Sequence, residues 1–304
     1  QINNLVKLEK NNEVSVAQPS IIDYNNKEKY EYAGASGGFI DFFGYPFCRG
    51  RVVKNLENCN KYNTTREVFW ASGCCFVVRK KIFTKLDGFD DEFFAHMEEI
   101  DFCWRLKNEY VNNKIISIGK AKVFHIGAGT LNYNSPKKYY LNFKNSLLML
   151  IKNVPSKFLF IVLFFRLISD SFIVMVSFLK LKPKLSYSIL RAYAYFILNF
   201  FSIIKKRTKN EKIDNYYYCF SLLINYYLMQ RKRFLRGSTT LALKQLKLIT
   251  MTREKFWRDT MRRELYLLRL EEQYLQMISM HLTTSYNRLH QTISLTEPMP
   301  STDT

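Results

Sequence analysis

A long apolar stretch near the middle of the chain sets the strongest limit on its fold. Residues 158–181, FLFIVLFFRLISDSFIVMVSFLKL, are long enough to cross a bilayer as one helix. Arg166 and Asp170 lie in its centre, one helical turn apart, and charges at that depth cost energy in hydrocarbon. A second apolar stretch follows Pro183. Basic residues flank the two stretches: Lys157, Lys180, Lys182, Lys184, Lys205, Lys206, Arg207 and Lys209.

This combination predicts helices that lie in the interface of an anionic membrane surface, with their apolar face toward the lipid and their basic residues near the headgroups. A buried helical hairpin of a soluble domain and true membrane spans are the alternatives.

The basic charge of the chain is unevenly spread. The formal net charge is +20, and residues 152–233 hold 15 Lys and Arg against 3 Asp and Glu. These charges lie beside apolar runs and are not interleaved with aromatic residues on a polar face, which favours a lipid partner and no nucleic acid. The 6 cysteines include no C-x-x-C pair, which favours reduced thiols and a cytosolic environment.

Residues 1–152 alternate between strand and helix patterns, which is typical of an α/β domain. Strands are predicted over VSVAQPSII (14–22), EVFWASGCCFVV (67–78, interrupted at Ser72 and Gly73), KIISI and KVFHI. Helices are predicted around KKIFTKL, over residues 95–109, and from Pro136 with Ser135 as its N-cap.

An acidic cluster, FFAHMEEIDFCWRL (93–106), lies at the start of the second of these helices. Glu98 and Asp101 are neighbours at i, i+3, while Glu99 projects about 100° away from Glu98. The positive end of the helix dipole favours carboxylates there. Taken alone, the cluster is most simply a solvated first turn in which Arg105 pairs with Asp101.

His125 ends the strand KVFHI, directly before a loop that contains Gly127 and Gly129. Loops at strand ends often carry function because a rigid scaffold holds them. Beside carboxylates, this imidazole could complete an oxygen-rich site for Mg²⁺ or Mn²⁺. A purely structural histidine is the alternative.

Five blocks in this order resemble the acceptor-side half of bacterial family-two glycosyltransferases with the GT-A fold, in particular their rhamnosyltransferase-like members. The resemblance implies a partial GT-A domain, a Rossmann-like nucleotide-diphospho-sugar transferase fold, over residues 1–152. Membrane-associated helices (153–233) and a helical extension with a disordered tail (234–304) would follow. The blocks are YAGASGGFIDFFGYPFCRGR (32–51), FWASGCCFVVRK (69–80), GFDDEFFAHMEEIDFCWRL (88–106), KVFHIGAGTL (122–131) and SPKKYYLNFKNSLLML (135–150).

The resemblance also implies roles for single residues in an inverting sugar transfer. Glu99 would be the general base that takes the proton from the acceptor hydroxyl, and Glu98 would hold or polarise that acceptor. The remaining substrate-binding candidates are Trp70, Ser72, Gly73, Asp101, Arg105 and Lys144. Of these, Trp70 would line the acceptor site, the break at Ser72 and Gly73 would let a sugar approach the backbone, and Lys144 would face the diphosphate.

His125 matches the family's third metal ligand, whose partners come from an Asp-x-Asp motif. No such motif occurs upstream of the acidic helix. We therefore expect a truncated chain, or a second polypeptide that supplies the donor-binding half, and little activity from the chain alone.

The function implied by the resemblance is transfer of a sugar from a nucleotide-diphospho-sugar to a glycan or lipid-linked acceptor in surface polysaccharide biosynthesis. It would occur at the cytoplasmic face of the bacterial inner membrane. An inactive remnant that acts as a membrane adaptor is the main alternative, and a basic nucleic-acid-binding protein is a weaker one.

The last part of the chain differs in composition. From residue 234 onward Arg outnumbers Lys 7 to 3. TREKFWRDTMRRELYLLRLEEQYLQM (252–277) has the apolar spacing of an amphipathic helix and shows no residue pattern that indicates chemistry.

Overall fold

The computed structural model describes residues 13–127, 135–207, 213–228 and 234, all of which lie in one compact unit, Gln1–Ala242. The predicted helix at 252–277 and the predicted disordered tail lie outside the described residues, as do Lys209 and Gly129.

The main sheet is built on two long parallel strands, β1 (Val14–Asp23) and β8 (Lys114–His125). The short strands β7 (Val77–Val78) and β6 (Arg66–Glu67) add antiparallel edges, so that the order is β6-β8-β1-β7. The predicted strands KIISI and KVFHI are one strand with a register shift between Pro19 and Ser20 of β1. Pro19 has no N–H to donate, which is consistent with an irregular ladder beside it.

The prediction of one interrupted strand over residues 67–78 is wrong, because only the two ends of this segment pair as strands. The Ser72 N–H donates to the Gln18 side chain at 2.8 Å, and the Ser72 hydroxyl donates to the Ala33 carbonyl. The Cys75 N–H then closes a turn on the Ser72 carbonyl at 3.2 Å. These bonds take the place of a sheet ladder.

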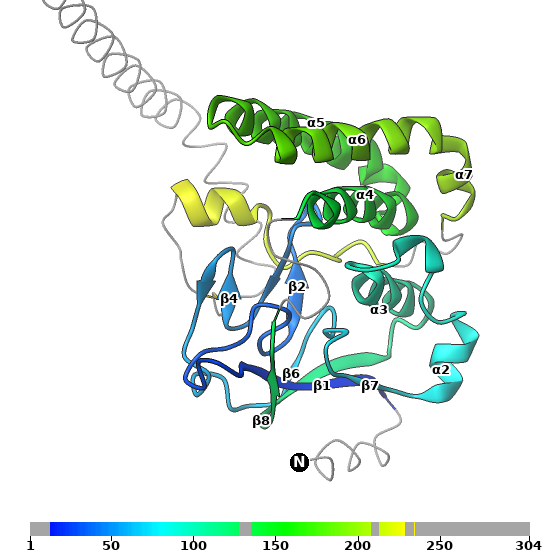
Figure 1. The fold of residues 1–304 in the computed structure, drawn as a ribbon. Helices are drawn as coiled ribbons and strands as arrows, with labels where there is room; N and C mark the ends of the chain where they lie inside the picture. Colours follow the sequence, from blue (N-terminus) through cyan, green and yellow to red (C-terminus); the bar gives the residue numbers. More distant parts are fainter. Residues whose placement is uncertain (1–12, 128–134, 208–212, 229–233, 235–304) are drawn as a thin grey trace, which may run out of the picture. The chain divides into compact units, whose positions relative to one another are not determined.

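A second, antiparallel sheet lies beside the first (Figure 1). Its strands follow one another as β2 (Gly38–Ile40), β3 (Pro46–Cys48), β4 (Arg51–Val52) and β5 (Asn55–Leu56). The segment that ends in the π-helix η3 (Ile224–Leu228) returns to this sheet, where the Leu222 N–H donates to Asp41 at 2.8 Å.

The helices of the first region form close to where the sequence predicts them. They are α2 (Lys80–Lys85), the 3-10 turn η2 (Asp91–Phe93), α3 (Glu98–Glu109) and α4 (Pro136–Asn153). Ser135 caps α4 as predicted, accepting from the Lys138 N–H at 3.2 Å. Helix α3 begins three residues later than predicted, because His96 and Met97 adopt positive φ angles of 71° and 73°.

Helices α5 (Ser156–Leu179), α6 (Pro183–Leu198) and α7 (Phe200–Lys205) form a layer over α4 (Figure 1). Arg166 and Asp170 are turned into the protein and are 2% and 0% exposed. The described residues leave the opposite face uncovered, so these helices are not a hairpin buried on all sides within the described part of the chain. The large hydrophobic residues exposed on them include Phe160, Phe164, Ile168, Phe172, Phe178, Leu181, Leu190, Ile197 and Phe201.

Helix α5 is also the one described helix whose length and composition would allow it to cross a membrane.

Candidate functional site

The loop before α3 has an unusual backbone. Phe94, His96 and Met97 all have positive φ, between 59° and 73°, which non-glycine residues rarely adopt. The amide nitrogen of Asn145 lies 2.8 Å from the carbonyl oxygens of Phe93, Ala95 and His96. Strained conformations persist where the surroundings hold them firmly, and they concentrate at functional sites. Helix α4 therefore determines how α3 begins.

The start of the same loop is held by side chains of α4, α6 and α7. Tyr195 donates to Glu92 at 2.7 Å, and Lys206 pairs with both Glu92 and Asp90. Lys152 lies 2.8 Å from Asp90. Burial alone would raise the pKa of Asp90, but the hydrogen bond and charge of Lys152, aided by Lys206, lower it to about 2. Side chains from α4, from α6 and from the end of α7 thus fix the entry to α3.

Glu98 and Glu99 form the half-buried first turn of α3. Burial, followed by the charge of Glu98, raises the pKa of Glu99 to about 7, and burial also raises the pKa of Glu98. The Oε2 atom of each has no hydrogen-bond partner within the described residues. A Cβ atom placed on the exposed Gly73 would lie 3.6 Å from the Cβ atom of Glu99, so the turn at Ser72 and Gly73 lies against Glu99. A carboxyl that titrates near neutral pH is suited to accept a proton.

His125 lies at the end of β8 with its Nδ1 atom 3.5 Å from Oε2 of Glu31, whose side chain is 4% exposed. Burial raises the pKa of the Cys74 thiol, and the charges of Glu31 and Glu99 raise it further. Glu31 escaped the sequence analysis, because nothing in EYAGAS distinguishes it from a surface glutamate.

The predicted metal site is incomplete in this geometry. Among the residues that the structure describes, no three His, Cys, Asp or Glu side chains come together to hold a metal ion. Within the described part of the chain, Glu31 is the acidic side chain that lies close to His125. An ion bound here would need further ligands from other residues, as the sequence also predicts, and the ligand role of His125 stays a prediction.

The sequence predicts that Asp101 lies beside Glu98 in a solvated first turn of the helix. In the structure Asp101 points into the protein instead. It is 0% exposed, and it accepts from Arg105 at 2.8 Å, Lys152 at 2.9 Å and Asn153 at 2.7 Å. Arg105 also donates to the carbonyls of Leu86 and Gly88. The predicted pairing of Asp101 with Arg105 is confirmed, but the solvated environment is wrong, and the geometry gives no support to a substrate contact by either residue.

Three other candidates are also engaged in the fold. Trp70 is 3% exposed, covers Gly38 and donates its indole N–H to the Phe39 carbonyl at 3.0 Å. Ser72 is buried in the turn described above. Lys144 donates to the Glu92 carbonyl at 2.6 Å, and burial lowers its pKa. Contacts of these side chains with substrate stay predictions. Among the six substrate-binding candidates named in the sequence analysis, Gly73 is the one that is exposed.

Asn145 is a residue that sequence reasoning missed. It is 0% exposed in the apolar run of α4, and a buried amide in such a run was the signal that could have identified it.

Replacing Asn145 with alanine is expected to loosen the start of α3. Three loop carbonyls would lose their common donor, so the backbone amides of residues 93–99 should exchange with solvent at least about tenfold faster. Hydrogen exchange followed by mass spectrometry measures this. Asn142→Ala on the same helix is the matched control and should leave exchange in the loop unchanged. Equal protection of the loop in both variants would contradict the proposed role of Asn145 in holding the start of α3.

Comparison with known proteins gives short partial similarities. No protein-family model matches the chain. Over 74 residues it is 32% identical to the N-acetylglucosaminyl-diphospho-decaprenol L-rhamnosyltransferase of Mycobacterium tuberculosis, covering 21% of this chain and 24% of that protein. Over 92 residues it is 27% identical to the low-salt glycan biosynthesis hexosyltransferase Agl10 of Haloferax volcanii, covering 29% and 28%. Its distant relatives are glycosyltransferases. The chain matches about a quarter of the length of each.

Proposed function

We propose that this chain is the acceptor-side part of an inverting glycosyltransferase with the GT-A fold, which transfers a sugar from a nucleotide-diphospho-sugar to a glycan or lipid-linked acceptor. The observation that carries the proposal is the Glu98–Glu99 pair, with a pKa of about 7 for Glu99, held by a strained loop beside Gly73. The similarity to a rhamnosyltransferase and a hexosyltransferase supports the same class of reaction.

In this proposal Glu99 takes the proton of the acceptor hydroxyl as its oxygen attacks the anomeric carbon. The bond from that carbon to the diphosphate oxygen breaks on the opposite face, and the electron pair leaves with the nucleoside diphosphate. A positioned base of this kind contributes about 10²- to 10⁴-fold to the rate. Burial, followed by the charge of Glu98, keeps the pKa of Glu99 high, so that at neutral pH the base is poised between its two protonation states. A bound divalent cation would stabilise the departing diphosphate.

The test is a transfer assay with a polypeptide that carries a donor-binding half, using radiolabelled nucleotide-diphospho-sugars and a polyprenyl-diphosphate-linked N-acetylglucosamine acceptor. Labelled lipid product is expected. Membrane binding without any transfer would favour the adaptor alternative.

His125→Ala, made in the same polypeptide, is expected to weaken Mn²⁺-dependent nucleotide binding, because an imidazole ligand is lost. Isothermal titration of nucleotide with and without Mn²⁺ measures the effect. Asn63→Ala, an exposed change on another loop, serves as control. A metal titration that His125→Ala leaves unaltered would remove the ligand role.

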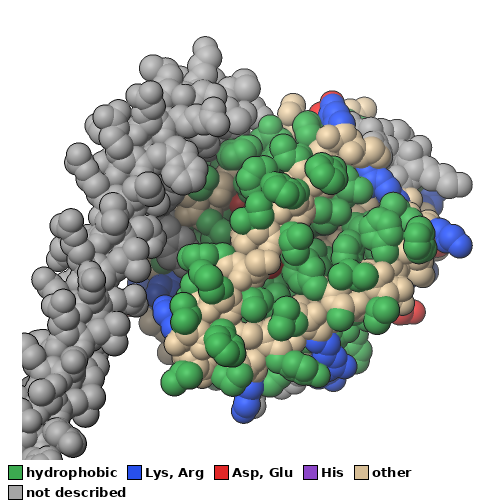
Figure 2. All heavy atoms as spheres, turned by 90° about the horizontal axis from the view of Figure 1, so that it is seen from above, with side chains coloured by type: hydrophobic (Ala, Val, Ile, Leu, Met, Phe, Trp, Pro, Cys, Tyr) green, Lys and Arg blue, Asp and Glu red, His purple; other side chains and the backbone are tan. Residues whose placement is uncertain are grey.

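We further propose that α5, α6 and α7 lie in the interface of an anionic membrane, at the cytoplasmic face of a bacterial inner membrane. Figure 2 shows hydrophobic side chains spread over the face formed by these helices, with Lys and Arg toward its edges. Asp170 pairs with Arg166 at 3.2 Å and accepts from Tyr45 and Tyr193, while Arg166 donates to Ser146. This buried network ties the middle of α5 to the domain, which favours a helix lying flat over a helix crossing the bilayer.

Changing Lys180, Lys182, Lys184 and Lys205 together to glutamine is expected to weaken binding to anionic vesicles strongly, since each basic residue near such a surface contributes about 1 kcal/mol. These four lysines are exposed, whereas Lys206 is left unchanged because it pairs with Glu92 and Asp90. Co-sedimentation with phosphatidylglycerol vesicles measures binding.

The control removes four exposed lysines elsewhere, Lys54, Lys80, Lys81 and Lys85, and should leave most of the binding. Equal losses for both quadruple variants would mean that only the net charge matters.

A further inference from the structure

A groove separate from the acidic pair lies along α5, between the turn to α6 and the segment around η3. Its volume is about 590 Å³, and its lining is mainly hydrocarbon. Apolar surface left open in this way is typical of a site that binds an apolar ligand or partner. Lining residues that matter below are Phe172, Ile173, Val176, Leu185, Leu223 and Ile224.

The rim of the groove is cationic. Lys180 and Lys182 line it, both are exposed, and none of the described residues that line the groove is acidic. Helix α6 begins at Pro183 without a side-chain cap at Lys182, so its first N–H groups add partial positive charge at the same end. A ligand that combines a hydrocarbon chain with an anionic head matches both the lining and the rim.

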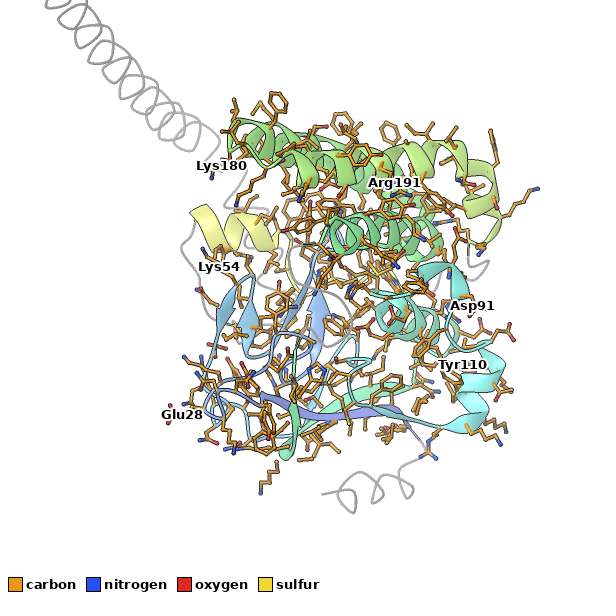
Figure 3. The ribbon with its side chains drawn as sticks, in the orientation of Figure 1. Glu28, Lys54, Asp91, Tyr110, Lys180 and Arg191 are labelled. Carbon is orange, nitrogen blue, oxygen red and sulfur yellow. The ribbon has the colours of Figure 1, made fainter. Side chains whose placement is uncertain are left out.

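Large hydrophobic side chains are exposed beside the groove. At the end of α5, Phe178 and Leu179 are 70% and 73% exposed, and Leu181 in the turn to α6 is 89% exposed. Lys180 lies at this end of α5, above the segment that ends in η3 (Figure 3). If the layer lies on a membrane, this turn reaches into the lipid, and a lipid chain can enter the groove without passing through water.

We propose that this groove binds the hydrocarbon chain of the lipid-linked acceptor, with the phosphate or diphosphate of that lipid on Lys180 and Lys182. Naming the lipid as the acceptor rests on the proposed function, but the binding itself requires no transfer. The inference assigns to α5 and α6 a role in selecting the substrate in addition to attachment to the membrane.

The experiment uses the full chain on vesicles of neutral phospholipid and a photoreactive farnesyl diphosphate analogue. Peptide mass spectrometry is expected to find the label in residues 169–185 and 223–224. Unlabelled farnesyl diphosphate should compete at least tenfold better than farnesol, which lacks the head, and than inorganic pyrophosphate, which lacks the chain. Equal competition by farnesol, or label spread over the outer face of α5, would overturn the proposal.

Two variants sharpen the test. Val176→Trp fills the groove and should reduce labelling at least tenfold, while the neighbouring Met175→Trp, which is outside the lining and 52% exposed, should leave it within twofold. Lys180→Gln with Lys182→Gln should remove the advantage of farnesyl diphosphate over farnesol without filling the groove. If this double variant keeps the full advantage, the rim does not bind the head and the proposal fails.

The outcomes separate this proposal from the proposed function. Specific labelling in a protein that transfers no sugar would support lipid binding in the groove and contradict the proposed glycosyltransferase activity. Transfer to a soluble acceptor without specific labelling would contradict lipid binding in the groove and leave the proposed activity supported.

Discussion

Replacing Glu99 with glutamine is expected to lower sugar transfer by about 10²- to 10⁴-fold and to make the folded protein more stable at neutral and alkaline pH. The loss of activity follows because an amide cannot take the proton of the acceptor hydroxyl. Transfer is measured in a polypeptide that carries the donor-binding half, and nucleotide binding should be nearly unchanged there.

The gain in stability follows from the raised pKa of Glu99, which is about 7 in the folded state against a model-compound value of 4.5. The folded state prefers the protonated acid, so the free energy of unfolding is undiminished below about pH 4.5, falls between about pH 4.5 and 7, and stays low above that. The loss is on the order of 1–3 kcal/mol. Glutamine resembles the neutral acid, so Glu99→Gln should abolish this loss of stability.

Urea denaturation of the chain itself at pH 4.5 and pH 8 tests this without any activity. The variant should equal the unmodified protein at the lower pH and exceed it at the higher one. Glu28→Gln, a change to an exposed glutamate, is the matched control and should show no such difference. If Glu99→Gln is no more stable at pH 8, the carboxylate is not held in an unfavourable environment, and the reason to regard it as a poised base disappears.

Replacing Asp101 with alanine is expected to destabilise the protein by about 3–5 kcal/mol, which is the usual effect of removing one partner from a buried ion pair. Lys152 is 4% exposed in its side chain and would lose one of its two carboxylates, while Arg105 would lose its only acidic partner among the described residues. The loop from Leu86 to Gly88, which Arg105 holds through two carbonyls, should loosen with it.

The midpoint and slope of urea unfolding measure this change. Asp91→Ala is the matched control, since Asp91 is exposed on η2 (Figure 3) and such surface changes usually stay within about 0.5 kcal/mol. A loss below about 1 kcal/mol for Asp101→Ala would mean that the remaining partners of Lys152, Asp90 among them, compensate for the lost carboxylate. Asp101 would then be free for the substrate role that its place in the sequence suggested.

The two carboxylates show why position in the sequence was not enough to assign roles. Glu99 and Asp101 lie two residues apart in the same helical turn, and helical geometry alone placed Asp101 with Glu98 on one face. The partners that distinguish them, Lys152 and Asn153, come from α4, about 50 residues further along the chain. Asn145 illustrates the same limit, because its acceptors are carbonyls in a loop about 50 residues away.

Features that depend on near neighbours could be predicted from the order of the residues. Strand β1, the capped start of α4, helix α3 to within one turn, and the long apolar helices with a charged pair in the middle all follow from local hydrogen bonding and apolar spacing. Three features became visible only in the folded chain: Asp101 faces the core, Arg166 and Asp170 pair inside the protein, and Glu31 lies beside His125. These outcomes depend on contacts between distant segments, whose energies outweigh the local preference of any one residue, and no short stretch of the chain contains both partners.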